Sequence, residues 1–211
     1  MFRRFFSSLY SLEQKVLGRF RIGRIPLVKK IKGVIFPFIW PAVAKVEGLT
    51  LRLDPVNGFV MDPALYKKPV ADLLKKEIRK GDTVLDVGAN IGVFTCLIAK
   101  LVGPQGKVFA FEPDPKNLEL LRRNLEENNL NNVLVVPKAL SDKTQMLKFF
   151  PSGVHGSTGF NAVSGAKPIT VSAIALDEFF GGDIPNISLI KIDAIGSEER
   201  ALYGMKNVLS K

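Results

Sequence analysis

The segment that most constrains the fold is TVLDVGANIGVFTCLIAK, residues 83–100. It begins with an apolar run that predicts a buried strand, passes through a glycine-containing turn, and continues with apolar residues at helical spacing. A strand that turns sharply into a helix is typical of parallel α/β folds, in which helices cover both faces of a sheet. The sequence therefore predicts an α/β fold in which this turn lies at the carboxyl end of a buried strand.

The rest of the chain after residue 49 alternates in the same way. Its near-continuous apolar runs are those of strands covered on both faces. Strands are expected at 49–53, 83–87, 107–112, 133–136, 146–150, 169–174 and 187–193. Helices are expected at 62–81, 92–102, 114–129 and 197–209, with a helical turn at 176–180. Asp114 followed by Pro115 predicts a helix start, because aspartate caps the first turn and proline suits its first position.

The residues of the turn discriminate between ligand classes. A dinucleotide-binding loop needs glycine in three places that are here Gly88, Asn90 and Val93, and the Gly-Lys-Ser/Thr of a P-loop is absent. The pattern acidic-x-Gly-x-Gly-x-Gly of an S-adenosylmethionine loop fits Asp86, Gly88, Asn90 and Gly92 with one exchange. Asparagine tolerates a left-handed backbone, so this exchange costs little. An acid and backbone N–H groups suit the ligand's ammonium and carboxylate.

A second acidic residue follows on the next predicted strand. Glu112 ends that strand, 20 residues after Gly92. A carboxylate in this position can accept hydrogen bonds from both hydroxyls of a ribose. Pro113 or Asp114 would then border the adenine.

Four blocks of the chain resemble the FkbM-type family of S-adenosylmethionine-dependent methyltransferases. They are VLDVGANIGVFTCLIAK, FAFEPDPKNLELLRRNL, VPKALSD and LIKIDAIGSEERALYGM. The resemblance implies a Rossmann-like class I methyltransferase sheet in the order 3-2-1-4 and O-methylation of a hydroxyl on a sugar, lipid-linked or polyketide-type small molecule. It implies S-adenosylmethionine as cofactor, held by Asp86, Gly88, Ala89, Asn90, Gly92, Glu112, Pro113, Ala139 and Asp142, with the last two beside the adenine.

Two residues are candidates for catalysis. The resemblance places Asp193, after the fourth core strand, near the transferable methyl, and His155 lies in a Gly/Ser-rich loop that could reach the same end of the sheet. An oxygen nucleophile benefits from a general base, which either residue could supply. The alternatives are that Asp193 is only a cofactor or structural contact and that His155 is a solvent-exposed loop histidine.

The chain departs from the family pattern in two places. The family usually has a glutamate two residues after the aspartate, where this chain has Ile195. The family fold also continues with further strands, so we expect a domain that is incomplete at its C-terminus, with an apolar edge covered by a partner subunit, by the N-terminal segment or by the strands of residues 146–174. The alternative function is a catalytically impaired, truncated relative that acts as a cofactor-binding or interaction module.

The charge divides the chain into two regions, residues 1–48 and 49–211. The first carries ten basic and two acidic residues, so most of the net charge of +10 lies there. This basic amphipathic segment is either a helical cap on the methyltransferase domain or a peripheral membrane anchor. No motif indicates nucleic-acid binding, one histidine argues against a histidine metal site, and the lone Cys96 fits a core residue in a cytoplasmic protein.

Overall fold

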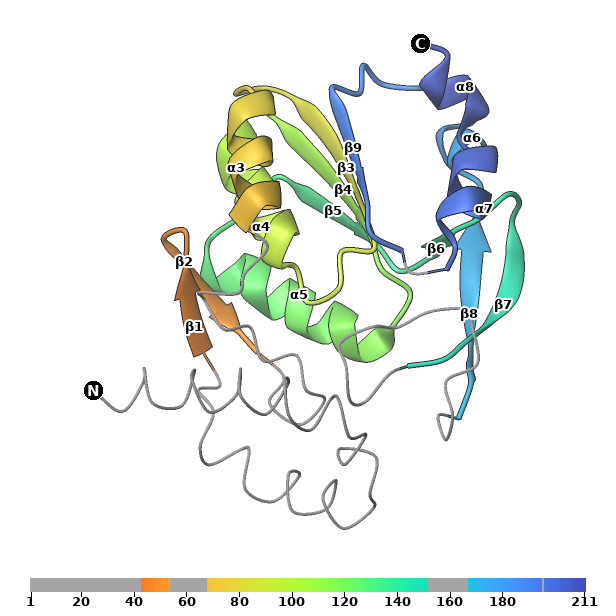
Figure 1. The fold of residues 1–211 in the computed structure, drawn as a ribbon, viewed down its shortest axis with the longest axis horizontal. Helices are drawn as coiled ribbons and strands as arrows, with labels where there is room; N and C mark the ends of the chain where they lie inside the picture. Colours follow the sequence, from red (N-terminus) through yellow and green to blue (C-terminus); the bar gives the residue numbers. More distant parts are fainter. Residues whose placement is uncertain (1–42, 54–67, 152–166, 195) are drawn as a thin grey trace.

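The computed structural model describes residues 43–53, 68–151, 167–194 and 196–211, and its centre is a parallel sheet (Figure 1). The sheet contains β3 (Thr83–Val87), β4 (Lys107–Phe111), β5 (Val133–Val136) and β9 (Leu189–Ile192) in the order β5-β4-β3-β9. All neighbouring strands are parallel. The predicted class I order 3-2-1-4 is thereby confirmed, together with the four core strands.

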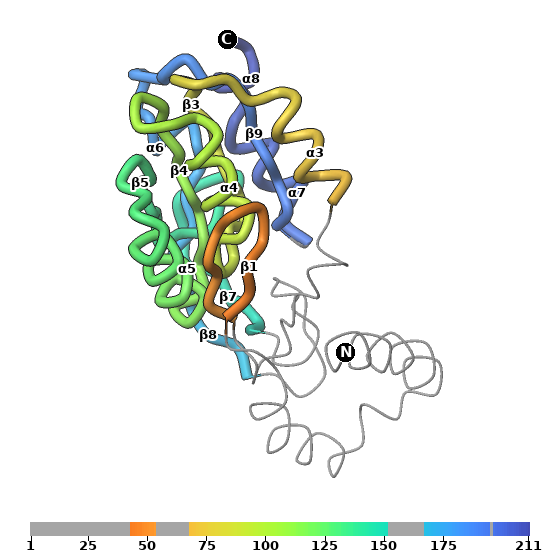
Figure 2. Tube along the Cα trace, turned by 90° about the vertical axis from the view of Figure 1, so that its left-hand side faces the viewer, coloured from red at the N-terminus to blue at the C-terminus, as the bar shows by residue number. Residues whose placement is uncertain are grey.

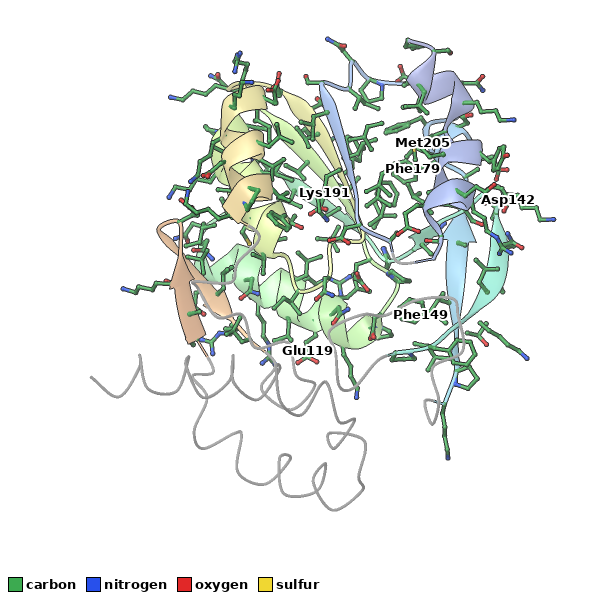
Figure 3. The ribbon with its side chains drawn as sticks, in the orientation of Figure 1. Glu119, Asp142, Phe149, Phe179, Lys191 and Met205 are labelled. Atoms are coloured by element: carbon green, nitrogen blue, oxygen red, sulfur yellow. The ribbon has the colours of Figure 1, made fainter. Side chains whose placement is uncertain are left out.

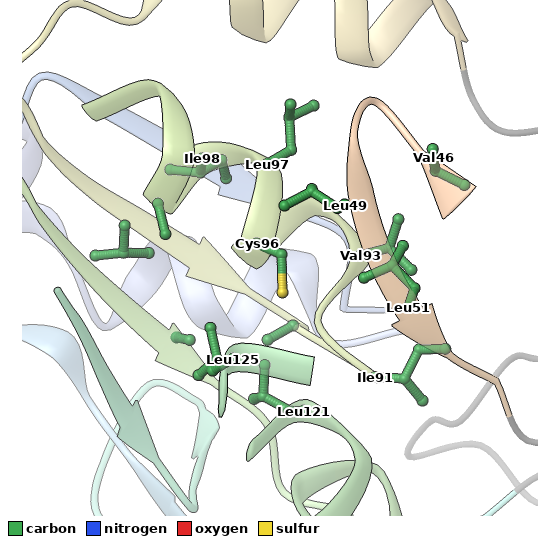
Figure 4. Packing of buried hydrophobic residues seen from close by; sticks show 14 of the residues in the cluster. Val46, Leu49, Leu51, Ile91, Val93, Cys96, Leu97, Ile98, Leu121 and Leu125 are labelled. Carbon is green, nitrogen blue, oxygen red and sulfur yellow. The ribbon is translucent and has the colours of Figure 1, made fainter. Parts of the chain in front are cut away.

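Three helices and a hairpin cover one face of this sheet. The helices are α3 (Lys68–Glu77), α4 (Val93–Val102) and α5 (Pro115–Glu127). Their apolar side chains form one core with β3 and β4, part of which is drawn in Figure 4. Asp114 caps α5 as predicted, because its side chain accepts a hydrogen bond from the backbone N–H of Lys116 at 2.9 Å.

The opposite face is covered by three short helices, α6 (Leu176–Phe180), α7 (Glu198–Tyr203) and α8 (Lys206–Leu209). The sequence predicted one helix over residues 197–209, but the helix is interrupted at Gly204 and divides into α7 and α8. A side chain at this position would place its Cβ 2.0 Å from the carbonyl oxygen of Ser141, so the backbones are in close contact there. The Asp177 carboxylate then accepts from the N–H groups of Asn207 and Val208, at 3.0 and 3.1 Å, and starts a new helix.

A second, smaller sheet lies beside the first. It consists of β6 (Ala139–Leu140), β7 (Gln145–Phe149) and β8 (Ile169–Ile174) in the order β6-β8-β7. The strands predicted at 146–150 and 169–174 therefore pair with each other and do not cover the edge of β9. Among the described strands, β9 pairs with β3 alone.

An antiparallel hairpin of β1 (Val43–Val46) and β2 (Leu49–Arg52) precedes the domain core. Figure 2 shows it beside α4 and α5. The predicted boundary between residues 48 and 49 falls in the turn of this hairpin, so residues 43–48 pack with the α/β domain. Residues 1–42 lie outside the described part of the chain, and the division into a basic segment and a domain stays a prediction. None of the described helices is long and apolar enough to cross a membrane.

Removing the cap of α8 should destabilise the protein. Asp177→Ala deletes both acceptors for the N–H groups of Asn207 and Val208, and we expect a loss of about 1 kcal/mol in the free energy of unfolding. Asp177→Asn keeps one side-chain carbonyl acceptor and should lose clearly less. Urea denaturation of the three proteins measures the difference, and equal stability of the alanine variant and the unmodified protein would contradict the assigned cap.

Candidate active site

The glycine turn connects β3 to α4 at the carboxyl end of the central strand. Gly88, Asn90 and Gly92 all have positive φ angles, of 77°, 53° and 88°. Such backbone suits glycine and, among other residues, asparagine. Asn90 thus has the left-handed conformation predicted from the sequence.

The N–H groups of the turn are directed into the protein. Each donates a hydrogen bond to a protein acceptor: Gly88 and Ala89 to the carbonyl oxygen of Phe111, Asn90 to Glu112 Oε2, Ile91 to Asn90 Oδ1, and Gly92 to the carbonyl oxygen of Ala89. A phosphate-binding loop instead directs its N–H groups at the ligand. The structure therefore agrees with the exclusion of phosphate, but it does not leave these five groups free for a ligand carboxylate.

Close backbone contact joins the turn to the end of β9. A Cβ on Gly88 would lie 2.3 Å from the carbonyl oxygen of Asp193, and the Asp193 N–H donates to the carbonyl oxygen of Val87 at 2.9 Å. Gly88 is thus required by the neighbouring strand, a reason that the sequence pattern did not reveal. This contact also brings together Gly88 and Asp193, two predicted site residues from distant motifs.

Glu112 follows β4 and connects two turns through its carboxylate. Oε2 accepts from the N–H of Asn90 at 2.8 Å, and Oε1 accepts from the N–H of Asp114 at 2.9 Å and from Asn117 Nδ2 at 3.2 Å. The residue is only 2% exposed. Burial raises the pKa of Glu112 to about 7, although its three N–H donors act in the opposite direction.

The described donors do not use all of the hydrogen-bonding capacity of Glu112. A carboxylate oxygen can accept two hydrogen bonds, and Oε2 has one described donor, the N–H of Asn90. A buried ionised carboxylate is stabilised by each further donor. A ribose hydroxyl would supply such a donor, so the residues of this site fit the ribose of S-adenosylmethionine.

Asp86 lies inside β3 and is fully buried, one residue before the end of the strand. Lys191 Nζ lies 2.7 Å from its Oδ1, and the Thr95 hydroxyl donates to its Oδ2 at 2.6 Å. Lys191 also donates to the carbonyl oxygen of Gly88 at 3.3 Å and lies 5.4 Å above the Phe94 ring. Both oxygens of Asp86 thus bind protein side chains. Because Lys191 also bonds the carbonyl oxygen of Gly88, the carboxylate stabilises the turn through this lysine.

Sequence reasoning missed Lys191, which lies near the centre of the view in Figure 3. The signal was a single lysine in the otherwise apolar run LIKI, residues 189–192. In the parallel pairing of β3 with β9, Asp86 and Lys191 are direct neighbours. A buried acid and a partly buried base on two adjacent strands could therefore have been paired once the sheet order was known.

The remaining predicted site residues fall into two groups. Pro113 lies between Glu112 and Asp114, next to the turn, whereas Ala139 belongs to β6 in the second sheet. Asp142 is exposed and accepts from Ser141 Oγ at 2.9 Å, a bond that lowers the pKa of Asp142. Figure 3 shows Asp142 beside α7, well apart from Lys191, so the structure does not bring it to the turn. His155 lies outside the described residues.

Comparisons with known proteins identify the family of this chain. A family model described as the methyltransferase FkbM domain matches residues 86–211. Hexuronic acid methyltransferase AglP of Haloferax volcanii is 28% identical over 187 residues, which are 88% of this chain and 71% of that protein. The 31-O-demethyl-FK506 methyltransferase FkbM of Streptomyces tacrolimicus is 30% identical over 138 residues, 64% of this chain and 52% of that protein. The chain thus spans about half the length of this second relative.

One solved structure with a similar region is M. jannaschii TYW2 in complex with AdoMet. It is 27% identical, with a TM-score of 0.39, over 44% of this chain and 41% of that one.

The buried pair of Asp86 and Lys191 should be strongly coupled. Lys191→Met leaves a buried carboxylate without its cation, and we expect a loss of about 3–5 kcal/mol in the free energy of unfolding. Adding Asp86→Asn to Lys191→Met removes the uncompensated charge and should restore much of that loss. Chemical denaturation measures all variants, with Lys68→Met as control for the exposed pair of Lys68 and Asp72, which should change stability little. Equal losses in the single and double variants would contradict a coupled pair.

Proposed function

The chain belongs to the methyltransferase FkbM domain family of S-adenosylmethionine-dependent methyltransferases, and from this membership we propose that it methylates a hydroxyl oxygen of a sugar, lipid-linked or polyketide-type small molecule. Two relatives support the acceptor class. One is named as a hexuronic acid methyltransferase, and the other as a methyltransferase of 31-O-demethyl-FK506. The whole reaction of this chain, including its acceptor, is inferred from them.

The observation that carries the proposal is the hydrogen bond between Glu112 and the N–H of Asn90. It joins the acid expected to hold the ribose to the turn expected to hold the rest of the cofactor. The cofactor supplies a methyl group on a positively charged sulfur, which leaves as a neutral thioether. The protein's main task is therefore to align the methyl group with the acceptor oxygen.

Asp193 is the candidate for handling the acceptor's proton. It follows β9 at the carboxyl end of the sheet, where ligands bind in open α/β folds. Its backbone contact with Gly88 fixes its distance from the cofactor turn. We propose that the Asp193 carboxylate accepts the hydroxyl proton as the new carbon–oxygen bond forms. His155 is the second candidate for this role.

Cofactor affinity should depend on pH through Glu112. Hydroxyl donors favour the ionised carboxylate, so S-adenosylmethionine should bind with release of a proton wherever the free carboxyl is protonated. With a pKa of about 7 for free Glu112, affinity should be constant above that pH and fall below it, by up to about tenfold per pH unit. Titration calorimetry measures this, and Glu112→Gln should bind more weakly with little pH dependence. A pH-independent affinity in the unmodified protein would contradict the role of Glu112.

The same pKa of Glu112 affects the ligand-free protein. The folded state holds a proton on this residue between pH 4.5 and about 7, whereas the unfolded chain has lost it. The contribution of Glu112 to stability is therefore present at low pH and falls as pH rises across that window. Denaturation curves of Glu112→Gln should lack this component, which separates the titration of Glu112 from that of other groups.

Catalysis should depend on the Asp193 carboxylate. We expect Asp193→Asn to lower kcat by about 10²–10⁴-fold, with an unchanged Kd for S-adenosylmethionine, because asparagine cannot accept the proton. Turnover is measured as S-adenosylhomocysteine release with a panel of hexuronic acids and other polyhydroxy acceptors. Asp72→Asn, on the exposed side of α3, is the control and should retain full turnover. Undiminished turnover in Asp193→Asn would show that Asp193 is not the residue that accepts the hydroxyl proton.

A further inference from the structure

Asn124 of helix α5 and Asn128, the residue that caps the C-terminal end of this helix, lie one turn apart and face the outer edge of β2. Asn128 Nδ2 donates to the carbonyl oxygen of Thr50 at 2.8 Å, and its Oδ1 accepts from the Thr50 N–H at 2.9 Å. Asn124 bonds Arg52 in the same way: Nδ2 donates to the carbonyl oxygen at 3.2 Å and Oδ1 accepts from the N–H at 2.6 Å. Each side-chain amide thus occupies the place of a backbone peptide group in a neighbouring strand.

The spacing of the two elements makes this pairing feasible. Four residues of an α-helix rise about 6 Å, and two residues of a strand rise about 6.7 Å. Asn124 and Asn128 can therefore reach alternate residues of β2, whose N–H and C=O groups face the same side. The other edge of β2 pairs with β1, so both edges of this strand are hydrogen-bonded. Further ion pairs and hydrogen bonds hold the hairpin to all three helices: Arg52 to Glu127, Glu47 to Lys75, and the Glu47 carbonyl to Lys100.

Each asparagine has one further contact, and these contacts differ. Asn128 Nδ2 also donates to the carbonyl oxygen of Asn124 at 2.7 Å. Asn124 instead bonds the glycine turn. Its Nδ2 also donates to the carbonyl oxygen of Ile91, at 2.7 Å, in the middle of the glycine turn. Asn124 is fully buried, and both of its N–H donors have acceptors. Ile91 is packed among residues of the hairpin, including Leu51, as Figure 4 shows. One side chain on α5 therefore links the hairpin to the turn.

The link also reaches Glu112. The peptide of Ile91 follows Asn90, whose own N–H donates to Glu112 Oε2. A carbonyl held at Ile91 and an N–H held at Asn90 fix this part of the turn from two sides. Without the Asn124 donor, a buried carbonyl would lose its partner, and the turn would move to satisfy it.

We propose that Asn124 is a positioning residue for S-adenosylmethionine: by bonding the Ile91 carbonyl and the Arg52 backbone together, it makes the hairpin of residues 43–52 part of the cofactor site. Asn124 acts on the cofactor through the turn and through Glu112, without touching the ligand. The effect on the cofactor rests on the function proposed above, whereas the effect on the turn itself does not.

The experiment compares Asn124→Ala with Asn128→Ala in the full chain. Both variants lose a bidentate contact to β2, but only the first loses the bond to the turn. We expect Asn124→Ala to raise the Kd for S-adenosylmethionine about tenfold over that of Asn128→Ala, as for one lost buried hydrogen bond. Amide hydrogen exchange, without ligand, should be faster at Asn90 and its neighbours in Asn124→Ala only. Melting temperatures of both variants show how far each is destabilised.

A measurement on the unmodified protein guards against a variant that fails to fold. The side-chain amide protons of Asn124 should exchange slowly and shift in the NMR spectrum when S-adenosylmethionine is added, while those of Asn128 should not shift. Equal Kd values and equal exchange at the turn in the two variants would overturn the proposal, as would unshifted Asn124 protons on saturation with cofactor. If the unmodified protein binds no S-adenosylmethionine, the proposed function fails, and hydrogen exchange alone decides whether Asn124 positions the turn.

Discussion

The buried ion pair between Asp86 and Lys191 fixes the arrangement on which the site depends. It is set by the register of β3 and β9, which places the two residues side by side in the sheet. A charge this deep in a protein is stable only when its partner is in place. The pair therefore fixes β9 against β3, and with it the close contact of Gly88 and Asp193 at the strand ends. The cofactor turn and the candidate base are thus held together by an ion pair of which only Asp86 belongs to the glycine pattern, whereas Lys191 lies outside it.

The parallel sheet could be predicted from the sequence because its signals are local. Apolar runs such as residues 83–87, followed by turn residues and helical spacing, define strands and helices without knowledge of their partners. Asp114 and Pro115 likewise mark a helix start by themselves. The Asp-x-Gly-x-Asn-x-Gly turn and Glu112 follow the same rule, since each lies at the carboxyl end of a predicted strand.

Features that depend on tertiary contact could not be predicted in this way. The break of the last helix at Gly204 results from its close approach to Ser141, a residue 63 positions earlier in the chain. The hairpin was divided between two predicted regions because its pairing with α5 uses asparagine side chains, which carry no periodic signal. Asp142 was expected beside the adenine by resemblance alone; it lies beside α7, apart from Lys191, and its role stays a prediction.

The recognition of β2 by Asn124 and Asn128 has a consequence for how such a protein can vary. Both amides bind only main-chain atoms of Thr50 and Arg52. These hydrogen bonds therefore do not depend on the side chains of the strand. Main-chain geometry is the same for nearly any residue except proline. Apart from Arg52 and Glu47, whose side chains form ion pairs with the helices, the outward positions of the hairpin are thus free to change with little effect on its attachment. Attachment through backbone hydrogen bonds lets the sequence of the hairpin vary while the structure of the catalytic core is retained.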